Sequence, residues 1–407
     1  MKRKPSPPPL AVADDRRQRK KSRRCRTSSA AAGDTELPLL FSKHNAVAPH
    51  LLVTEVFYTP PSHNPCAFNR RGAIISVPLD GDVVTAARYT SAPIRRRGRL
   101  ADLHRRCMSF LGATPRGRLA FAGSRGVFLV NPVTDALQGF NAMGYCQKAL
   151  LAAGAACGGG SGGGCGIFVS LGAVLAPPAL WRLDGDGERW SECPLAATGE
   201  QTSDVVAAVS SGKGCFYYLL HEDGSVSRVD AGEPPPLRVE KLPVASLVDH
   251  FVSPPRGESL AGEGHLLECD GEVLFVRKLL AVKEIAAPFC AHAEFVAVAG
   301  FEVYTMDVAA RRWEKVERLP GGGDTAIFVN PESAFTVRAS DTTAATGGMM
   351  GNCVYFVGES RCCFTCGVYG GSTWGAYSMD DREILFEHAV ESRGGRTEAL
   401  WFLPSVV

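Results

Sequence analysis

Residues 265–277 read His-Leu-Leu-Glu-Cys-Asp-Gly-Glu-Val-Leu-Phe-Val-Arg, with an apolar run on each side of Asp270-Gly271. An Asp-Gly pair tolerates the positive φ angles of a tight turn, so these residues predict a β-hairpin. Similar short runs, separated by Gly, Asp and Pro, continue to residue 404 and leave few candidate helices, which predicts an all-β repeat fold. The further runs are 301–307, 313–319, 325–329, 335–337, 352–356, 374–380 and 400–404.

One element recurs through the chain, an apolar strand that ends at an Asp or Asn in a turn. These turn residues are Asp80, Asn131, Asp184, Asp230, Asp307 and Asp380, with spacings of 51, 53, 46, 77 and 73 residues. A period near 50 residues with four strands per unit predicts a β-propeller of about six blades. The longer spacings hold either insertions or another blade, so a count of seven stays open. A pair of β-sandwich domains is the competing fold.

Two segments are expected to close the ring. The first β-like run after the polar N-terminal segment is 51–58, and an apolar run lies at 400–403. Joining both in one composite blade would remove two exposed sheet edges. Trp190 and Trp313 each follow a turn Asp by six residues, so we expect both to pack between blades.

Composition limits the class of protein. The 407 residues are 45% hydrophobic and include 44 Gly, 26 Pro and 14 Cys. Charges interrupt every long apolar run, so no membrane span and no membrane partner are expected. The first nine residues lack the apolar core of a secretory signal. The irregular cysteine spacing favours reduced thiols in an intracellular protein over a disulfide framework.

Charge separates the N-terminal segment from the rest. Residues 1–26 hold 11 Lys and Arg against Asp14 and Asp15, a charge of +9, whereas the remainder carries −7. Residues 1–44 are predicted to be a disordered basic, Pro-rich tail, and residues 45–407 the propeller domain.

The tail predicts import into the nucleus. Two basic clusters separated by a Pro-rich spacer are typical of a two-part import signal, which an import receptor would bind. A solvated tail that binds anions weakly is the alternative, and cytoplasm, mitochondrion and plastid are the alternative locations. The candidate signal residues are Lys2, Arg3, Lys4, Arg16, Arg17, Arg19, Lys20, Lys21, Arg23 and Arg24.

The runs in the second half are ordered as in a known family. They comprise 266–274, 301–307, Trp313, 327–329, 351–356, 374–380 and 401–404, with a looser match at 124–132. This set resembles the plant KIB-type β-propeller family, an F-box-associated family long described only as a domain of unknown function. The resemblance implies a propeller with a protein-interaction role, and it supplies no catalytic residues.

The chain departs from the family members that carry an F-box. Residues 37–40 resemble an F-box opening, but Pro49, Pro60, Pro61 and Pro65 follow too soon for its helices. A link to ubiquitin-ligase machinery is therefore not predicted. The family also has organelle-targeted members, but Asp14 and Asp15 argue against a transit peptide.

Few residues predict chemistry. Cys353, Cys362, Cys363 and Cys366 include one Cys-x-x-Cys spacing, which is compatible with a zinc site, but buried or loop thiols are the favoured interpretation. A basic patch at 95–106 lacks interleaved aromatic residues, so nucleic acid is a less favoured partner. We therefore predict a non-enzymatic module, with no catalytic, cofactor or metal residues, that binds a regulatory protein at a propeller face. The alternatives are nuclear nucleic-acid association through the tail and a propeller enzyme with an unrecognised channel site.

Overall fold

The structure is a computed structural model, and the strands that it describes all lie within residues 37–407. In the described part of the chain, no helix is long and apolar enough to cross a membrane. The described residues are 49–57, 69–75, 77, 79–81, 91–93, 109–114, 117–123, 126–140, 146–153, 165–171, 178–183, 189–196, 203–211, 215–251, 260, 263–284, 294–341, 348–359, 372–390 and 396–403.

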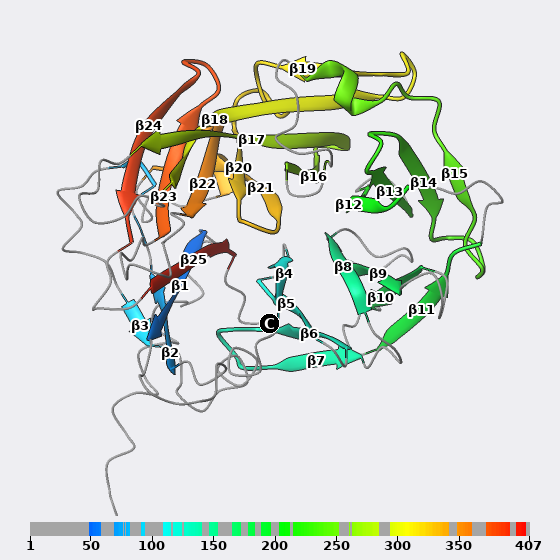
Figure 1. Cartoon of the computed structure of the whole chain (residues 1–407), viewed down its shortest axis with the longest axis horizontal. Helices are drawn as coiled ribbons and strands as arrows, with labels where there is room; N and C mark the ends of the chain where they lie inside the picture. Colours follow the sequence, from blue (N-terminus) through cyan, green and yellow to red (C-terminus); the bar gives the residue numbers. More distant parts are fainter. Residues whose placement is uncertain are drawn as a thin grey trace, which may run out of the picture. The chain divides into compact units, whose positions relative to one another are not determined.

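Within these residues the strands form six sheets, which follow one another around a common centre (Figure 1). Blade 1 contains β25 (Arg396–Phe402), β1 (His50–Phe57), β2 (Asn69–Ile75) and β3 (Ser91–Pro93). Blade 2 contains β4 (Ser109–Ala113), β5 (Leu119–Gly123), β6 (Gly126–Val130) and β7 (Leu137–Phe140). Blade 3 contains β8 (Cys146–Ala153), β9 (Cys165–Leu171), β10 (Ala179–Leu183) and β11 (Trp190–Pro194).

The other three blades complete the ring. Blade 4 contains β12 (Val205–Ser210), β13 (Phe216–His221), β14 (Val226–Asp230) and β15 (Val239–Lys241), followed by the 3-10 helix η2 (Leu247–His250). Blade 5 contains β16 (Gly264–Cys269), β17 (Glu272–Glu284), β18 (Glu294–Asp307) and β19 (Arg312–Val316). Blade 6 contains β21 (Ala334–Arg338), β20 (Thr325–Val329), β22 (Cys353–Glu359), β23 (Ser372–Ser378) and β24 (Glu383–Ala389), and the 3-10 helix η3 (Ala339–Asp341) follows β21.

The repeated sequence element is the strand next to the outer edge of each blade: β2, β6, β10, β14, β18 and β23. This confirms the six-bladed prediction. The two long spacings hold insertions: β17 and β18 are 13 and 14 residues long, and blade 6 carries the additional strand β21. The described strands therefore need no seventh blade to account for these spacings.

Blade 1 is built from both ends of the folded unit. Strand β1 pairs antiparallel with β2 on one side and with β25 on the other, with Leu51 opposite Trp401. Leu51 and Trp401 are both fully buried in one hydrophobic cluster. The predicted composite blade is confirmed, and its physical basis is the pairing of two strands that would otherwise leave open edges.

Tryptophans pack between neighbouring blades, as predicted. Trp313 of blade 5 is 1% exposed and shares a cluster with Val206 and Leu220 of blade 4. Trp190 of blade 3 is half-buried, and its ring centroid lies 4.8 Å from that of Phe140 in blade 2.

Two tight turns in adjacent blades have different surroundings. The turn Asp270-Gly271, here called the rim turn, joins β16 to β17, and its φ values of 53° and 84° confirm the predicted hairpin geometry. The turn 330–333, here called the central turn, joins β20 to β21. Strand β20 pairs antiparallel with β21 and parallel with β22, so β21 is inserted at the inner edge of blade 6.

The central turn links three other blades. The Asn330 side-chain amide donates to the Trp401 carbonyl oxygen at 3.0 Å and accepts from the Trp401 N–H at 2.6 Å. The Ser333 hydroxyl accepts from the Ala113 N–H of blade 2 at 3.3 Å. The carbonyl oxygen of Asn330 lies 3.1 Å from His265 Nε2 of blade 5. Asn330 is fully buried, so this turn acts as an internal tie between blades.

Candidate binding cavity between blades 5 and 6

A cavity of about 200 Å³ lies where the rim turn of blade 5 meets β20 and β21 of blade 6. Its wall combines a thiol, two hydroxyls, one apolar side chain and one pair of opposite charges. The lining residues are Cys269, Asp270, Thr325, Thr336, Val337 and Arg338. A space of this size admits a side chain or a small functional group.

Thr325 places an unusual polar atom in this wall. It is 2% exposed, and its Oγ1 atom has no hydrogen-bond partner among the described residues. The neighbouring Cys269 thiol is a weak partner and already donates to the Pro320 carbonyl oxygen at 3.8 Å. By contrast, the Thr336 hydroxyl donates to the Glu268 carbonyl oxygen at 3.2 Å. Burying a hydroxyl without a strong partner costs free energy, so Thr325 is a local defect in the packing between blades 5 and 6.

Three carboxylates act on the Cys269 thiol of the cavity. Glu268, Asp270 and Glu272 all lie close enough to Cys269 to act on its thiol electrostatically. The Asp270 carboxylate forms an ion pair with Arg338, whose side chain is 55% exposed. Among the described lining residues, Asp270 and Arg338 are the charged pair, and Glu268 and Glu272 lie outside the lining.

The cavity thiol is held in its neutral form. Burial raises the pKa of Cys269 to about 12, and the negative charge of Asp270 adds to the effect. Burial likewise raises the pKa of Cys353 in β22 to about 11, with Asp380 contributing. Because the thiolate is the reactive form, neither thiol is suited to nucleophilic chemistry near neutral pH.

Gly321 lies close to Asp270 and Thr325. Its φ is +95°, and a Cβ at this position would lie 2.4 Å from Thr325 Oγ1 and 2.7 Å from Asp270 Oδ2. A side chain would therefore be strained and would collide with both polar groups. Glycine allows the chain to pass close to both groups.

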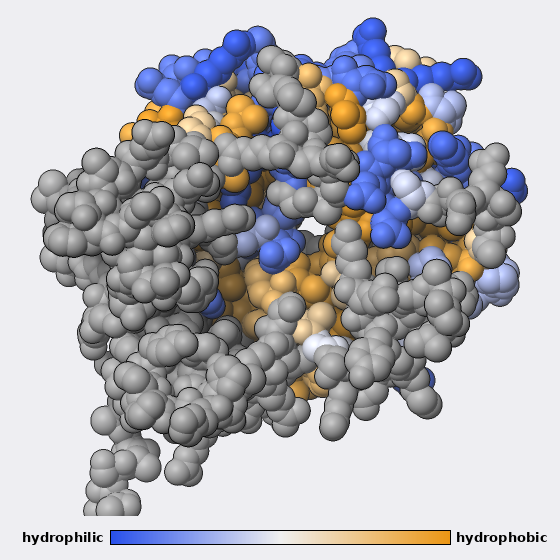
Figure 2. All heavy atoms as spheres, viewed as in Figure 1, coloured by the Kyte–Doolittle hydropathy of each residue, from blue (hydrophilic) through white to orange (hydrophobic). Residues whose placement is uncertain are grey.

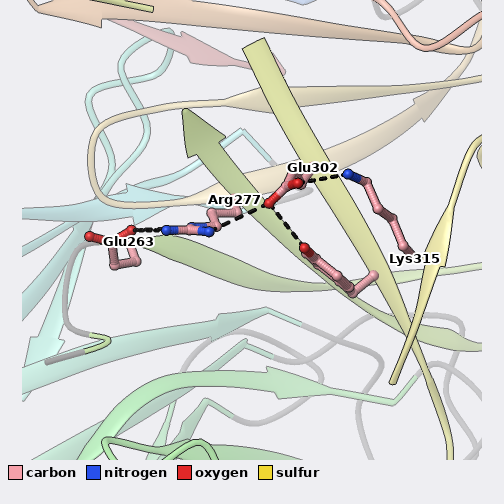
Figure 3. Close-up of polar contacts among 5 residues, drawn as sticks. Glu263, Arg277, Glu302 and Lys315 are labelled. Carbon is pink, nitrogen blue, oxygen red and sulfur yellow. Dashed lines mark hydrogen bonds and ion pairs between the residues drawn. The ribbon is translucent and has the colours of Figure 1, made fainter. Parts of the chain in front are cut away.

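A separate charged cluster lies inside blade 5 (Figure 3). Arg277 of β17 is 3% exposed and contacts Glu263 Oε2 at 3.1 Å and Glu302 Oε2 at 3.5 Å. Lys315 Nζ lies 2.6 Å from Glu302 Oε1, and the Tyr304 hydroxyl donates to Glu302 Oε2 at 3.0 Å.

The partners of this cluster point to a structural role. Two carboxylates balance two cations, and the Arg277 guanidinium also lies 4.1 Å from the ring centroid of Phe251. Each buried charge is thus compensated by neighbours on β17, β18 and β19 and on the segments before β16. We interpret the cluster as a support for blade 5.

A histidine in β16, the inner strand of blade 5, has a shifted pKa. Burial lowers the pKa of His265 from 6.5 to about 4, and the nearby charge of Lys278 acts in the same direction. Since the Asn330 carbonyl can only accept, the neutral imidazole donates from Nε2. Figure 2 shows a hollow near the middle of the visible face, with hydrophobic residues on its floor and hydrophilic residues beside them.

The residues chosen from sequence do not form this cavity. All ten nuclear-signal candidates lie outside the described residues, as do Cys362, Cys363, Cys366 and the basic patch at 95–106. Among the described residues, no group of three or more His, Cys, Asp or Glu is placed to hold a metal ion. The zinc hypothesis therefore stays untested at three of its four positions.

Sequence reasoning identified the rim turn but missed its partners across the blade boundary. Thr325 begins the predicted run 325–329 and Arg338 follows the predicted run 335–337, so a polar residue at the start of an apolar run was the available signal. Nothing in their spacing indicates that the two ends meet Asp270.

Comparisons with known proteins give one family match. The model of the KIB1-4 beta-propeller family matches residues 89–378. Among curated proteins, none matches the chain.

Several solved structures are similar at low identity. Apo AztD from Citrobacter koseri is 13% identical, with 58% of this chain and 52% of AztD covered and a TM-score of 0.27, so the chain spans about half the length of AztD. A Synechocystis apocarotenoid oxygenase mutant is 10% identical, with 85% and 79% covered and a TM-score of 0.37. The tricorn protease is 10% identical, with 79% and 34% covered and a TM-score of 0.32.

The family match starts before blade 2 and ends at the last residue of β23. It thus includes the rim turn, the central turn and the cavity between blades 5 and 6. Because it covers well over half of the 407 residues, the chain belongs to the KIB1-4 β-propeller family.

Proposed function

We propose that the protein is a non-enzymatic interaction module, which binds a regulatory protein partner through a propeller face in the nucleus of a plant cell. The observation that carries this proposal is the polar cavity between blades 5 and 6, which is mounted on a closed ring. Turns and loops held by a rigid sheet framework are suited to binding, because they are ordered before the partner arrives.

The internal contacts support a scaffold role. The central turn ties blade 6 to blades 1, 2 and 5, and the Arg277 cluster holds blade 5 together. The two buried thiols with raised pKa values and the neutral His265 are poorly suited to acid–base or nucleophilic work near neutral pH.

Proximity labelling in plant cells tests the interaction function. The full chain is compared with residues 45–407 alone and with residues 1–44 alone, each fused to the same labelling enzyme. In a common extract, we expect both propeller-containing fusions to label a shared set of proteins. The tail fusion should not label this set. Labelling that depends on the tail alone, together with steeply salt-dependent nucleic-acid binding, would favour the nucleic-acid function instead.

The nuclear location is tested separately. Replacing Lys20, Lys21, Arg23 and Arg24 with Ala should move a fluorescent fusion of the full chain towards the cytoplasm, because an import receptor reads these charges in an extended segment. A fusion that stays nuclear would place the signal elsewhere, and import into mitochondria or plastids would replace the nuclear assignment.

A further inference from the structure

We propose that the partner adds an extended, basic segment as a further strand at the outer edge of β24 in blade 6. This inference rests on the proposed interaction function and names the chemistry of the segment that docks. It adds a contact on the side of the ring to the contact at a propeller face. Figure 1 shows β24 at the outside of blade 6, next to β23.

Strand β24 offers the longest outer edge among the described blades. It has 7 residues, whereas the outer strands β3, β7, β11, β15 and β19 have 3 to 5. Natural edge strands are commonly protected by shortness or by Lys and Pro. Strands β3 and β11 contain Pro, β15 and β19 contain Lys, and β7 has only 4 residues. The sequence of β24, Glu-Ile-Leu-Phe-Glu-His-Ala, has neither Lys nor Pro.

The backbone of β24 has unpaired groups on this edge. The bond from the Val390 N–H to the Ser372 carbonyl oxygen, 2.9 Å long, continues the ladder between β23 and β24. In an antiparallel ladder, pairs that exchange hydrogen bonds alternate with pairs that do not. Glu387 and Ala389 therefore direct their N–H and carbonyl groups away from β23, where no described residue bonds to them. An added strand would supply these partners.

Aromatic packing holds one face of β24 in place. The rings of Phe386 and His388 stack with centroids 5.2 Å apart, and their centroids lie 5.5 and 5.0 Å from that of Trp374 in β23. Gly81 leaves room for the Phe386 ring, which would lie 2.3 Å from a Cβ at that position. The strand is thus fixed before the partner binds, which lowers the conformational cost of pairing.

Exposed side chains on β24 select the kind of segment. Leu385 is 37% exposed at a shift in the register with β23, and the exposed Glu383 and Glu387 lie on either side of it. Residues 380–389 hold four carboxylates against one arginine, a charge of −3. A segment with Lys or Arg beside an apolar side chain complements this edge. Pairing with a second copy would instead place two negative segments side by side, which is unfavourable.

Peptide binding to the full chain at low ionic strength tests the edge. The probe is a fluorescent peptide of alternating Lys and Val, followed by anisotropy. One counterpart alternates Glu and Val, and another is the Lys–Val peptide with N-methyl groups on alternate amides. We expect the Lys–Val peptide to bind saturably and the Glu–Val peptide not to bind. N-methylation keeps the charge but removes N–H donors, so it should weaken binding about tenfold.

Variants supply matching changes on the protein, and urea unfolding shows whether each keeps the fold. Ala389→Pro removes an N–H that points away from β23, so the internal ladder stays and binding should weaken about tenfold. Glu387→Gln can still accept from the Thr373 hydroxyl and should weaken binding about threefold. Glu314→Gln, at an exposed carboxylate on the outer strand β19, is the matched control and should bind like the unmodified chain.

Amide hydrogen exchange gives a readout that depends on no variant. Saturating Lys–Val peptide should slow the exchange of the Glu387 and Ala389 N–H groups, because both become hydrogen-bonded to the added strand. Unchanged exchange would mean that charge alone binds the peptide, and it would overturn the inference. Equal binding of the N-methylated peptide would overturn it as well, as would self-association of the chain that Ala389→Pro abolishes.

Capture of the labelled partners separates this inference from the proposed function. If the unmodified chain and a folded Ala389→Pro variant capture the partners equally, the assignment of β24 fails while the interaction function stands. If the peptide binds as expected but no propeller-dependent partner exists, the interaction function fails while β24 remains a peptide-binding edge.

Discussion

The rim turn and the central turn are both short connections between strands at the inner side of adjacent blades, and both begin with an Asx residue. Asp270 of the rim turn is exposed, lines a cavity and forms an ion pair with the exposed Arg338 side chain. Asn330 of the central turn is fully buried and directs its amide to the backbone of Trp401. Burial thus separates the roles: the exposed turn can exchange partners, whereas the buried turn holds the ring together.

The largest effect is expected where the central turn meets β25. Deleting residues 399–407 removes most of the strand that pairs with β1, so solubility or cooperative unfolding should be lost. Trp401→Ala keeps the strand and should lower the free energy of unfolding by about 3–5 kcal/mol, since the side chain is fully buried. Urea unfolding measures the stability of both variants. Leu385→Ala, at an exposed position, is the control and should have a small effect. A soluble truncated chain with unchanged unfolding would contradict ring closure.

The second effect concerns Asn330 itself. Asn330→Ala leaves the N–H and carbonyl groups of Trp401 buried without these partners, so stability should fall by about 2–4 kcal/mol. Asn330→Asp can still accept from the N–H and should give a smaller loss. Equal stability of Asn330→Ala and the unmodified chain would show that the tie between blades 6 and 1 is dispensable.

The third effect is acid sensitivity at the contact between β16 and the central turn. The pKa of His265 is lowered to about 4 in the folded chain from 6.5, so the unfolded chain binds more protons between these values. Stability should therefore fall as pH decreases from 6.5 to 4, by at most about 3 kcal/mol from this group. His265→Gln should reduce the slope of the unfolding free energy against pH in this window. An unchanged slope would mean that carboxylates, and not His265, cause the pH dependence.

A fourth substitution, in the cavity wall, should have the opposite sign. Thr325→Val removes a buried hydroxyl without a partner among the described residues and keeps the shape of the side chain. The free energy of unfolding should rise by about 1 kcal/mol. Thr325→Ser keeps the hydroxyl and serves as the comparison; a destabilised Thr325→Val variant would mean that the hydroxyl has a structural partner.

The smallest effect is expected at the rim turn. Asp270→Asn breaks an exposed ion pair, and Asn tolerates the φ of 53°. Stability should change by less than about 0.5 kcal/mol. Urea midpoints of this variant and of Asn330→Ala, measured together, test the contrast between the two turns; equal losses would remove it.

Local sequence patterns identified much of the fold. Asp270-Gly271 marked a hairpin because few dipeptides tolerate two positive φ values, and the run 325–329 coincides with β20. The spacing of turn residues indicated six blades, because each blade repeats the same strand next to its outer edge. These features depend on residues close together in the chain, so they can be read from sequence.

The inserted strand β21 could not be recognised in this way. Residues 335–337 predict a strand, but their alternation is compatible with any position in a sheet. Only pairing with β20 places β21 inside blade 6, and only then does Asn330 reach Trp401, 71 residues away.

The sequence by itself determined the all-β class, the repeat, the hairpin at Asp270-Gly271 and the pairing of the two end segments, because backbone conformation and the burial of strand edges follow from residue type and order. The tertiary structure alone decided which polar groups meet. Asp270, Thr325 and Arg338 come from three separate strand ends, and their meeting depends on how blade 5 packs on blade 6. Burial in the folded ring likewise decides that the Thr325 hydroxyl lacks a strong partner and that Asn330 links two blades.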